Sequence, residues 1–203
     1  MASKKKAIAN KTKKKPKAKK TTAKKTTAKK TSAKKTSAKA KAPKVAPKDP
    51  PGPKEGDVAP AFSLPGDDGQ MHALADHRGQ DVVVYFYPRD DTPGCTVEAC
   101  DFRDNMARVA AKGAVVYGVS KDSMASHDKF KSKFGLNFTL LSDEDKAVHT
   151  KYGAWGEKVL YGQKMIGVIR STFWIGPDGT IKQAWRRVKT DGHVDAVLQA
   201  MGA

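Results

Sequence analysis

The chain has 203 residues, with 39 lysines and arginines against 21 acidic residues, for a formal net charge of +18 at pH 7. Residues 1–54 hold 21 lysines and one acid, a net charge of +20, which leaves a net of −2 for residues 55–203. No apolar run approaches the roughly 18 residues of a membrane span, and no apolar segment follows the basic start as in a signal peptide, so we expect neither a membrane protein nor a secreted one. The two cysteines are too few for a disulfide scaffold and are typical of a reducing compartment.

Residues 1–54 are predicted to form a disordered basic tail and linker. A five-residue unit of Thr, Ser, Ala and Lys repeats over residues 21–40, with almost no apolar residue larger than alanine. Such a segment cannot bury enough surface to offset the entropy lost on ordering. The tail resembles those of linker histones and histone-like bacterial proteins, which implies sequence-independent binding of DNA or RNA by counterion release. A solubilising segment or a nuclear address remains an alternative.

The composition changes near residue 55, where the folded part is predicted to begin. Five prolines between residues 43 and 53 predict an extended spacer. The 149 residues from 55 to 203 are the usual size of one domain. The tail lacks the arginines and amphipathic periodicity of a transit peptide, so we expect a cytoplasmic protein that associates with a nucleoid, or a nuclear one if the host is eukaryotic.

The first half of the domain is predicted to centre on one buried strand. A small hairpin is expected from residues 61–64 and 71–73, around an Asp-Asp-Gly turn. Residues 82–87 are apolar, β-branched and aromatic, which predicts a central strand over residues 81–87, and Pro88 ends it. A helix over residues 93–112 follows, with Thr92 as its N-cap and Gly113 as its stop.

The second half alternates strands and helices and then closes with a hairpin. We predict strands at 114–120 and 138–141, helices at 123–134 and 145–152, and a glycine-rich loop at 153–167. Strands at 168–175 and 181–186 around a Pro-Asp-Gly turn, and a helix at 192–201, complete the chain. This order predicts an α/β fold, thioredoxin-like, with a central mixed β-sheet flanked by helices.

Both cysteines fall on the predicted helix 93–112. Cys95 lies in the first turn, where free backbone amides and the positive end of the helix dipole favour a thiolate. Four residues separate Cys95 from Cys100, and no histidine lies nearby at ligand spacing, so a zinc site is not predicted.

Residues 88–95, Pro-Arg-Asp-Asp-Thr-Pro-Gly-Cys, resemble the Pro-x-x-x-Thr-x-x-Cys signature of peroxiredoxins. Residues 96–100, Thr-Val-Glu-Ala-Cys, are similar to the subgroup called peroxiredoxin Q or bacterioferritin comigratory protein. The resemblance extends over residues 55–203 but not over the tail. It implies reduction of hydrogen peroxide and organic hydroperoxides, recycling by thioredoxin or a similar dithiol, a monomer, and no metal, haem or flavin.

The resemblance also implies a role for each residue of the motif. Cys95 would be the peroxidatic nucleophile that becomes a sulfenic acid, and Cys100 the resolving cysteine that forms an intramolecular disulfide with it. Thr92 would hydrogen-bond thiolate and peroxide, Arg170 would hold the thiolate ionised, and Pro88 would shield it from water. The residues alone leave alternatives open: a helix cap for Thr92, a surface arginine, a strand-ending proline and a structural thiol.

The spacing of the two cysteines has a geometric consequence. Five residues along an α-helix advance about 7.5 Å and turn by about 140°, which places the Cα atoms roughly 8.6 Å apart. A disulfide tolerates at most about 7 Å. If one helix carries both cysteines, its first turns must unwind before Cys95 and Cys100 can bond.

The remaining candidate residues are assigned ordinary roles. Glu98 could tune the first turn, but it is interpreted as an ordinary N-terminal acid favoured by the helix dipole. The histidines are predicted to be surface or packing residues, and the tryptophans core residues, with Trp155 in a loop that could border the site. A DNA-associated redox sensor or protective nucleic-acid-binding protein remains the alternative function. This alternative depends on composition alone.

Overall fold

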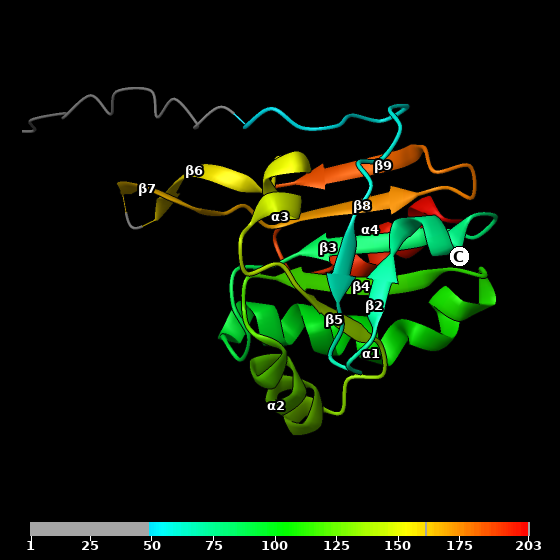
Figure 1. Cartoon of the computed structure of the whole chain (residues 1–203), viewed down its shortest axis with the longest axis horizontal. Coiled ribbons are helices and arrows are strands. Elements are labelled where there is room, and N and C mark those ends of the chain that lie inside the picture. Colours follow the sequence, from blue (N-terminus) through cyan, green and yellow to red (C-terminus); the bar gives the residue numbers. More distant parts are fainter. Residues whose placement is uncertain (1–48, 161, 203) are drawn as a thin grey trace, which may run out of the picture. The chain divides into compact units, whose positions relative to one another are not determined.

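The computed structural model of the chain describes residues 49–160 and 162–202. The predicted basic repeats therefore lie outside the described residues. The centre of the fold is a five-stranded sheet in the order β5-β4-β3-β8-β9 (Figure 1). Its strands are β3 (Val82–Phe86), β4 (Val115–Ser120), β5 (Thr139–Ser142), β8 (Ser171–Ile175) and β9 (Ile181–Arg186). Strands β3, β4 and β5 are parallel, whereas β8 is antiparallel to β3 and β9, so the predicted mixed sheet is confirmed.

Strand β3 is the central strand that the sequence predicts. All five of its residues are buried, and successive side chains enter two different hydrophobic clusters. A strand covered on both faces has no solvated side for polar residues, which explains its continuous apolar run.

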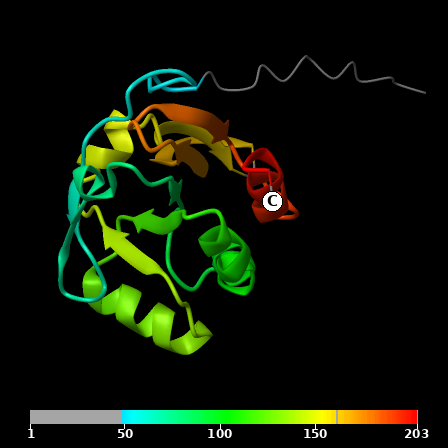
Figure 2. The ribbon, with the colours of Figure 1, turned by 90° about the vertical axis from the view of Figure 1, so that its right-hand side faces the viewer.

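Three helices cover one face of the sheet: α1 (Pro93–Ala111), α2 (Met124–Phe134) and α4 (His193–Ala200). Phe102 of α1, Phe130 of α2 and Leu198 of α4 pack with Val83 and Tyr85 of β3 in one buried cluster. Figure 2 shows α1 on the opposite side of the sheet from the hairpin of β1 (Ser63–Pro65) and β2 (Met71–Ala73).

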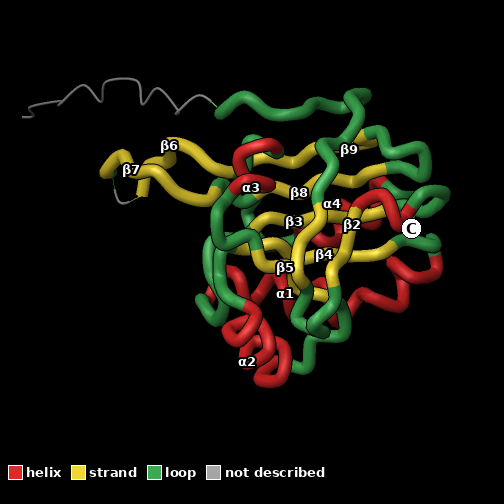
Figure 3. The backbone as a smooth tube through the Cα atoms, in the orientation of Figure 1, coloured by secondary structure: helices red, strands yellow, loops and turns green. Residues whose placement is uncertain are grey.

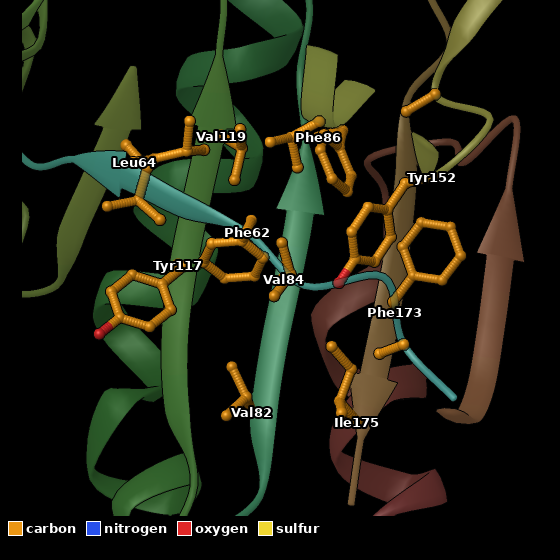
Figure 4. Packing of buried hydrophobic residues seen from close by; sticks show 14 of the residues in the cluster. Phe62, Leu64, Val82, Val84, Phe86, Tyr117, Val119, Tyr152, Phe173 and Ile175 are labelled. Atoms are coloured by element: carbon orange, nitrogen blue, oxygen red, sulfur yellow. The ribbon is translucent and has the colours of Figure 1, made fainter. Parts of the chain in front are cut away.

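The other face is covered by β1 (Ser63–Pro65), β2 (Met71–Ala73), the short 3-10 helix η1 (Leu74–His77) and α3 (Ala147–Lys151). Figure 4 shows Phe62 lying over Val84, and the rings of Tyr152 and Phe173 side by side, with centroids 5.1 Å apart. The hydroxyl of Tyr152 donates to the carbonyl oxygen of Pro60 at 2.8 Å, so this buried tyrosine keeps a hydrogen-bond partner.

The predicted loop 153–167 is wrong, because these residues form the hairpin β6 (Trp155–Leu160) and β7 (Gln163–Val168) (Figure 3). Its glycines suggested a loop, but Gly156 and Gly167 pair across the two strands. A Cβ at Gly156 would lie 3.0 Å from the ring of Pro50, and one at Gly167 would lie 2.8 Å from Cε of Lys158. These glycines therefore allow close approach inside strands.

Two further predicted elements differ in extent. The expected strand 168–175 is interrupted at Ile169 and Arg170, which lie between β7 and β8. The expected helix 145–152 is only the five residues of α3, because Lys146 has a left-handed φ of 63° and ends the preceding turn. The other boundaries agree within the one or two residues by which helix and strand ends usually vary.

The last residues assigned to the linker contact the domain. Arg186 donates from Nη2 to the carbonyl oxygen of Pro53 at 2.9 Å, and Arg187 pairs with Asp49 at 2.7 Å. A Cβ at Gly52 would lie 2.7 Å from the Tyr152 carbonyl oxygen. Among the described residues, no helix has the length and apolar character to cross a membrane.

Candidate active site

The first turn of α1 places Cys95 at the end of the central strand. Thr92 is the N-cap, with extended backbone angles, and Pro93 is the first helical residue, as the sequence predicts. The first helical hydrogen bond runs from the Thr96 amide to the Thr92 carbonyl at 2.8 Å. Cys95 therefore lies at the amide-rich end of the helix, and its side chain is only 2% exposed.

The sheet register brings Arg170 to this cysteine. Ser171, the first residue of β8, pairs with Phe86, the last residue of β3, so Arg170 lies beside the loop that leads to α1. Its Nη2 donates to the sulfur of Cys95 at 3.2 Å. A guanidinium is always charged and directs its donors in a fixed plane, so this contact stabilises a thiolate.

Glu98 is the residue whose role was predicted wrongly. Its side chain is fully buried and accepts a hydrogen bond from Nη1 of Arg170, so it is no ordinary surface acid. Burial raises the pKa of Glu98 to about 7, although the charge and hydrogen bond of Arg170 act to lower it. Its spacing of three residues from Cys95 was the available signal, because residues i and i+3 share a helix face.

Thr92 and Pro88 precede Cys95 in the segment that joins β3 to α1. The Thr92 hydroxyl donates to the carbonyl oxygen of Arg89 at 3.1 Å and makes no capping bond to the helix. Thr92 is thus the N-cap by position only. Pro88 is half-buried and lines an open hollow beside Arg170.

Cys100 lies on the same helix as Cys95, as predicted, and is half-buried. Both cysteines are free thiols. Because α1 is continuous over both positions, ideal helix geometry separates their Cα atoms by roughly 8.6 Å.

The loop between β3 and α1 is anchored by Asp90, which is buried. Asp90 accepts hydrogen bonds from Tyr87 and Ser126, each at 2.7 Å, and from Nδ1 of His127 at 2.9 Å. Burial acts to raise the pKa of Asp90, but the hydrogen bond and charge of His127 outweigh it and the pKa is lowered. Helix α2, which carries Ser126 and His127, therefore fixes the loop that positions Cys95.

The other histidines are packing residues with polar partners. His149 is buried and pairs with Asp143 at 2.6 Å, while His72 and His77 both contact the hydroxyl of Tyr117. His193 is buried against Thr172, and burial, with the charge of Arg170, lowers its pKa to about 4. Within residues 49–160 and 162–202, no three His, Cys, Asp or Glu side chains are grouped as metal ligands.

An open hollow adjoins the site at Arg170. Apolar and basic residues line it: Pro88, Lys158, Val168, Ile169, Arg170, Arg187 and Val188. Trp155, predicted to be a core residue in a loop that could border the entrance, is half-buried and packs against the core on the other face of the sheet.

Known proteins are similar to this chain in sequence and fold. The sequence profile of the AhpC/TSA family matches residues 56–184. A putative peroxiredoxin bcp of Coxiella burnetii is 50% identical over 143 residues, which are 70% of this chain and 95% of that protein. Peroxiredoxin Bcp of Escherichia coli K12 is 48% identical over 145 residues, 71% of this chain and 93% of that protein.

A solved structure supports the same assignment. Peroxiredoxin Q of Xanthomonas campestris superposes with a TM-score of 0.66 at 44% identity, covering 70% of this chain and 89% of that one. The thioredoxin-like fold is thereby confirmed. The chain belongs to the AhpC/TSA family, in the peroxiredoxin Q or Bcp subgroup of thiol peroxidases.

Proposed function

We propose that Cys95 reduces hydrogen peroxide and organic hydroperoxides and that thioredoxin or a similar dithiol returns it to the thiol. The observation that carries this proposal is the 3.2 Å contact of Arg170 with the Cys95 sulfur in the first turn of α1. A related structure, 43% identical, is described by the alkyl peroxide reduction activity of Xanthomonas campestris bacterioferritin comigratory protein.

The first step transfers one oxygen atom to sulfur. The Cys95 thiolate attacks a peroxide oxygen, an S–O bond forms as the O–O bond breaks, and the leaving hydroxide or alkoxide takes a proton to become water or alcohol. The guanidinium of Arg170 stabilises the charge on the breaking O–O bond, and Thr92 turns its hydroxyl from Arg89 to the thiolate and peroxide. Pro88 restricts access of water from the hollow.

The second step forms a disulfide within the chain. The thiol of Cys100 attacks the sulfur of the Cys95 sulfenic acid, and water leaves. A dithiol reductant then exchanges with this disulfide and restores both thiols. The reductant must reach a sulfur that is buried in the reduced state, so its access also depends on the opening of α1.

Residues 1–48 are proposed to bind nucleic acid without sequence preference. They carry 20 lysines and no acid, which is the charge needed to displace counterions from many phosphates. We further propose that the protein is a monomer and works in the cytoplasm, associated with nucleic acid through this tail.

The activity is tested by peroxide consumption coupled to thioredoxin, thioredoxin reductase and NADPH. Wild-type protein should turn over repeatedly, Cys95→Ser should be inactive, and Cys100→Ser should consume one equivalent and then stall unless an external thiol is added. Thioredoxin-coupled turnover by Cys95→Ser would refute the nucleophile. A wild-type protein that reacts once and is not recycled by any dithiol would instead favour a redox sensor.

A further inference from the structure

Besides Arg170, a second positively charged side chain, Lys158 of β6, lies beside the proposed active site. Lys158 is half-buried, and its ammonium donates to the carbonyl oxygen of Val168 at 3.1 Å. Its stem covers Gly167, where a Cβ would be 2.8 Å from Cε of the lysine. Val168 precedes Arg170 by two residues, so the hairpin, which extends from the sheet in Figure 1, carries a charge back to the segment that holds the arginine.

The charge of Lys158 acts on the two groups that define the site. Lys158 and Arg170 line the same hollow, together with Pro88. Burial lowers the pKa of Lys158, the positive charge of Arg170 lowers it further, and the Cys95 sulfur opposes both. Since Lys158 lines the same hollow as Arg170, which contacts the Cys95 sulfur, its ammonium acts on the same site.

Charged or titratable groups surround Cys95 on three elements and one connecting segment: Glu98 on α1, Tyr85 on β3, Lys158 on β6 and Arg170 between β7 and β8. Tyr85 stays uncharged, because burial and the negative groups near it raise its pKa well above the usual value. When Glu98 is ionised, its charge cancels that of Arg170, with which it is paired.

A thiolate at Cys95 would then add a negative charge that Arg170 alone does not balance. An unbalanced charge is costly in a site with little water, where it favours the neutral form of the group. Arg187 also lines the hollow, but its guanidinium is paired with Asp49. Of the described residues that line the hollow, Lys158 supplies the positive charge that restores neutrality to the set of Cys95, Glu98 and Arg170.

We propose that Lys158 is a positioning residue for the peroxidase reaction. Its ammonium supplies the positive charge that keeps Cys95 ionised while the charge of Arg170 is neutralised by its ion pair with Glu98. The proposal rests on the proposed role of Cys95. A merely structural Lys158 would only cover Gly167 and bond to Val168.

The test measures alkylation of Cys95 by iodoacetamide against pH, in full-length Cys100→Ser protein. This reagent is neutral, so its rate follows the thiolate fraction and not charge steering. Lys158→Met keeps most of the stem and removes the charge, and we expect the midpoint of the pH profile to rise by about one unit. Below the midpoint the rate should fall roughly tenfold. Lys158→Arg should restore the profile.

The matched control is Lys164→Met on β7. It removes the same charge from the same hairpin, but Lys164 is exposed and paired with Glu157 at 2.9 Å, so the profile should not move. In a Glu98→Gln background, Arg170 is no longer neutralised and the shift caused by Lys158→Met should shrink. A structural role would give the same shift in both backgrounds.

An unchanged midpoint in Lys158→Met would overturn the proposal, as would a shift that Lys158→Arg fails to reverse. The proposed function is tested separately by mass spectrometry for the sulfenic acid after one equivalent of peroxide is added to the Cys100→Ser protein. If Cys95 is not oxidised there, the peroxidase proposal fails, while the alkylation profiles still report on Lys158.

Discussion

At the scale of single residues, one guanidinium connects the chemistry of the site. Arg170 donates to the Cys95 sulfur with one nitrogen and to the Glu98 carboxylate with the other. Lysine could not replace it, because an ammonium lacks the planar pair of donors that reaches both partners at once.

The buried carboxyl of Glu98 makes folding stability depend on pH. Its pKa is about 7 in the folded chain against a usual value of 4.5, so the folded state holds this proton more tightly than the unfolded state. Stability from this group is fully present below about pH 4.5 and is lost as the pH rises through 7. The loss is on the order of 3 kcal/mol.

Glu98→Gln removes that titration while keeping an acceptor for Arg170. We expect the free energy of unfolding of the variant, relative to wild type, to rise by a few kcal/mol between pH 4.5 and pH 8, on the order of the loss above. Urea unfolding of the reduced proteins at both pH values measures it. Parallel pH dependences in the two proteins would show that Glu98 does not titrate in this range.

Thr92 allows a test of the peroxide contact. Its hydroxyl bonds to the Arg89 carbonyl in the peroxide-free state, so Thr92→Val loses the proposed donor at little cost in volume. We expect the second-order rate with peroxide to fall about a hundredfold, as for loss of one donor to developing charge. Thr92→Ser should retain most of the rate in a stopped-flow measurement, and an unaffected Thr92→Val protein would exclude the contact.

At the scale of elements, the two steps of the proposed reaction require different geometries of α1. It holds Cys95 under Arg170 for the first step, yet the same continuous helix keeps Cys100 roughly 8.6 Å away between Cα atoms. Ser126 and His127 of α2 form hydrogen bonds to Asp90 and so hold the loop that precedes α1. Unwinding of α1 is therefore expected to begin after Thr92. Slow unwinding would leave time for excess peroxide to convert the sulfenic acid to sulfinic acid.

Hydrogen exchange tests this unwinding. We expect the oxidised protein to contain an intramolecular disulfide and to lose amide protection mainly between residues 93 and 104, because local opening needs less free energy than global unfolding. The comparison is made by mass spectrometry on reduced and oxidised protein. Cys100→Ser treated with one equivalent of peroxide is the control, and it should keep its protection. Equal protection in reduced and disulfide forms would contradict the prediction.

At the scale of the whole molecule, charge separates the tail from the catalytic domain. Residues 1–48 carry the net charge of +20, whereas residues 49–54 contact the domain through Asp49 and Pro53. A truncated protein should therefore begin at residue 49, so that these contacts are kept.

We expect deletion of residues 1–48 to leave peroxide reduction nearly unchanged and to abolish most binding of duplex DNA. If the tail neutralises on the order of ten phosphates, log affinity of the full chain against log salt has a slope near −9 with little sequence preference. Mobility shifts over a salt series, beside the coupled peroxidase assay, measure both. Undiminished DNA binding by the truncated protein would place the nucleic-acid site in the domain.

The sequence by itself determined the features that depend on local pattern. The apolar run of β3, the Thr-Pro start of α1 and the stop at Gly113 are written in neighbouring residues, and so is the position of Cys95 in the first turn. Arg170 was predicted only through the family resemblance, because it is 75 residues from Cys95. No local rule connects two residues at that separation.

Only the tertiary structure decided what lies around the Cys95 sulfur. The register of β3 with β8 brings Arg170 to Cys95, and burial turns Glu98 from a helix-start acid into the partner of that arginine. The glycines of β6 and β7 indicated a loop, but packing makes them a hairpin that carries Lys158 to the site. These contacts depend on which distant segments pack together. The residue pattern along a single segment does not contain that information.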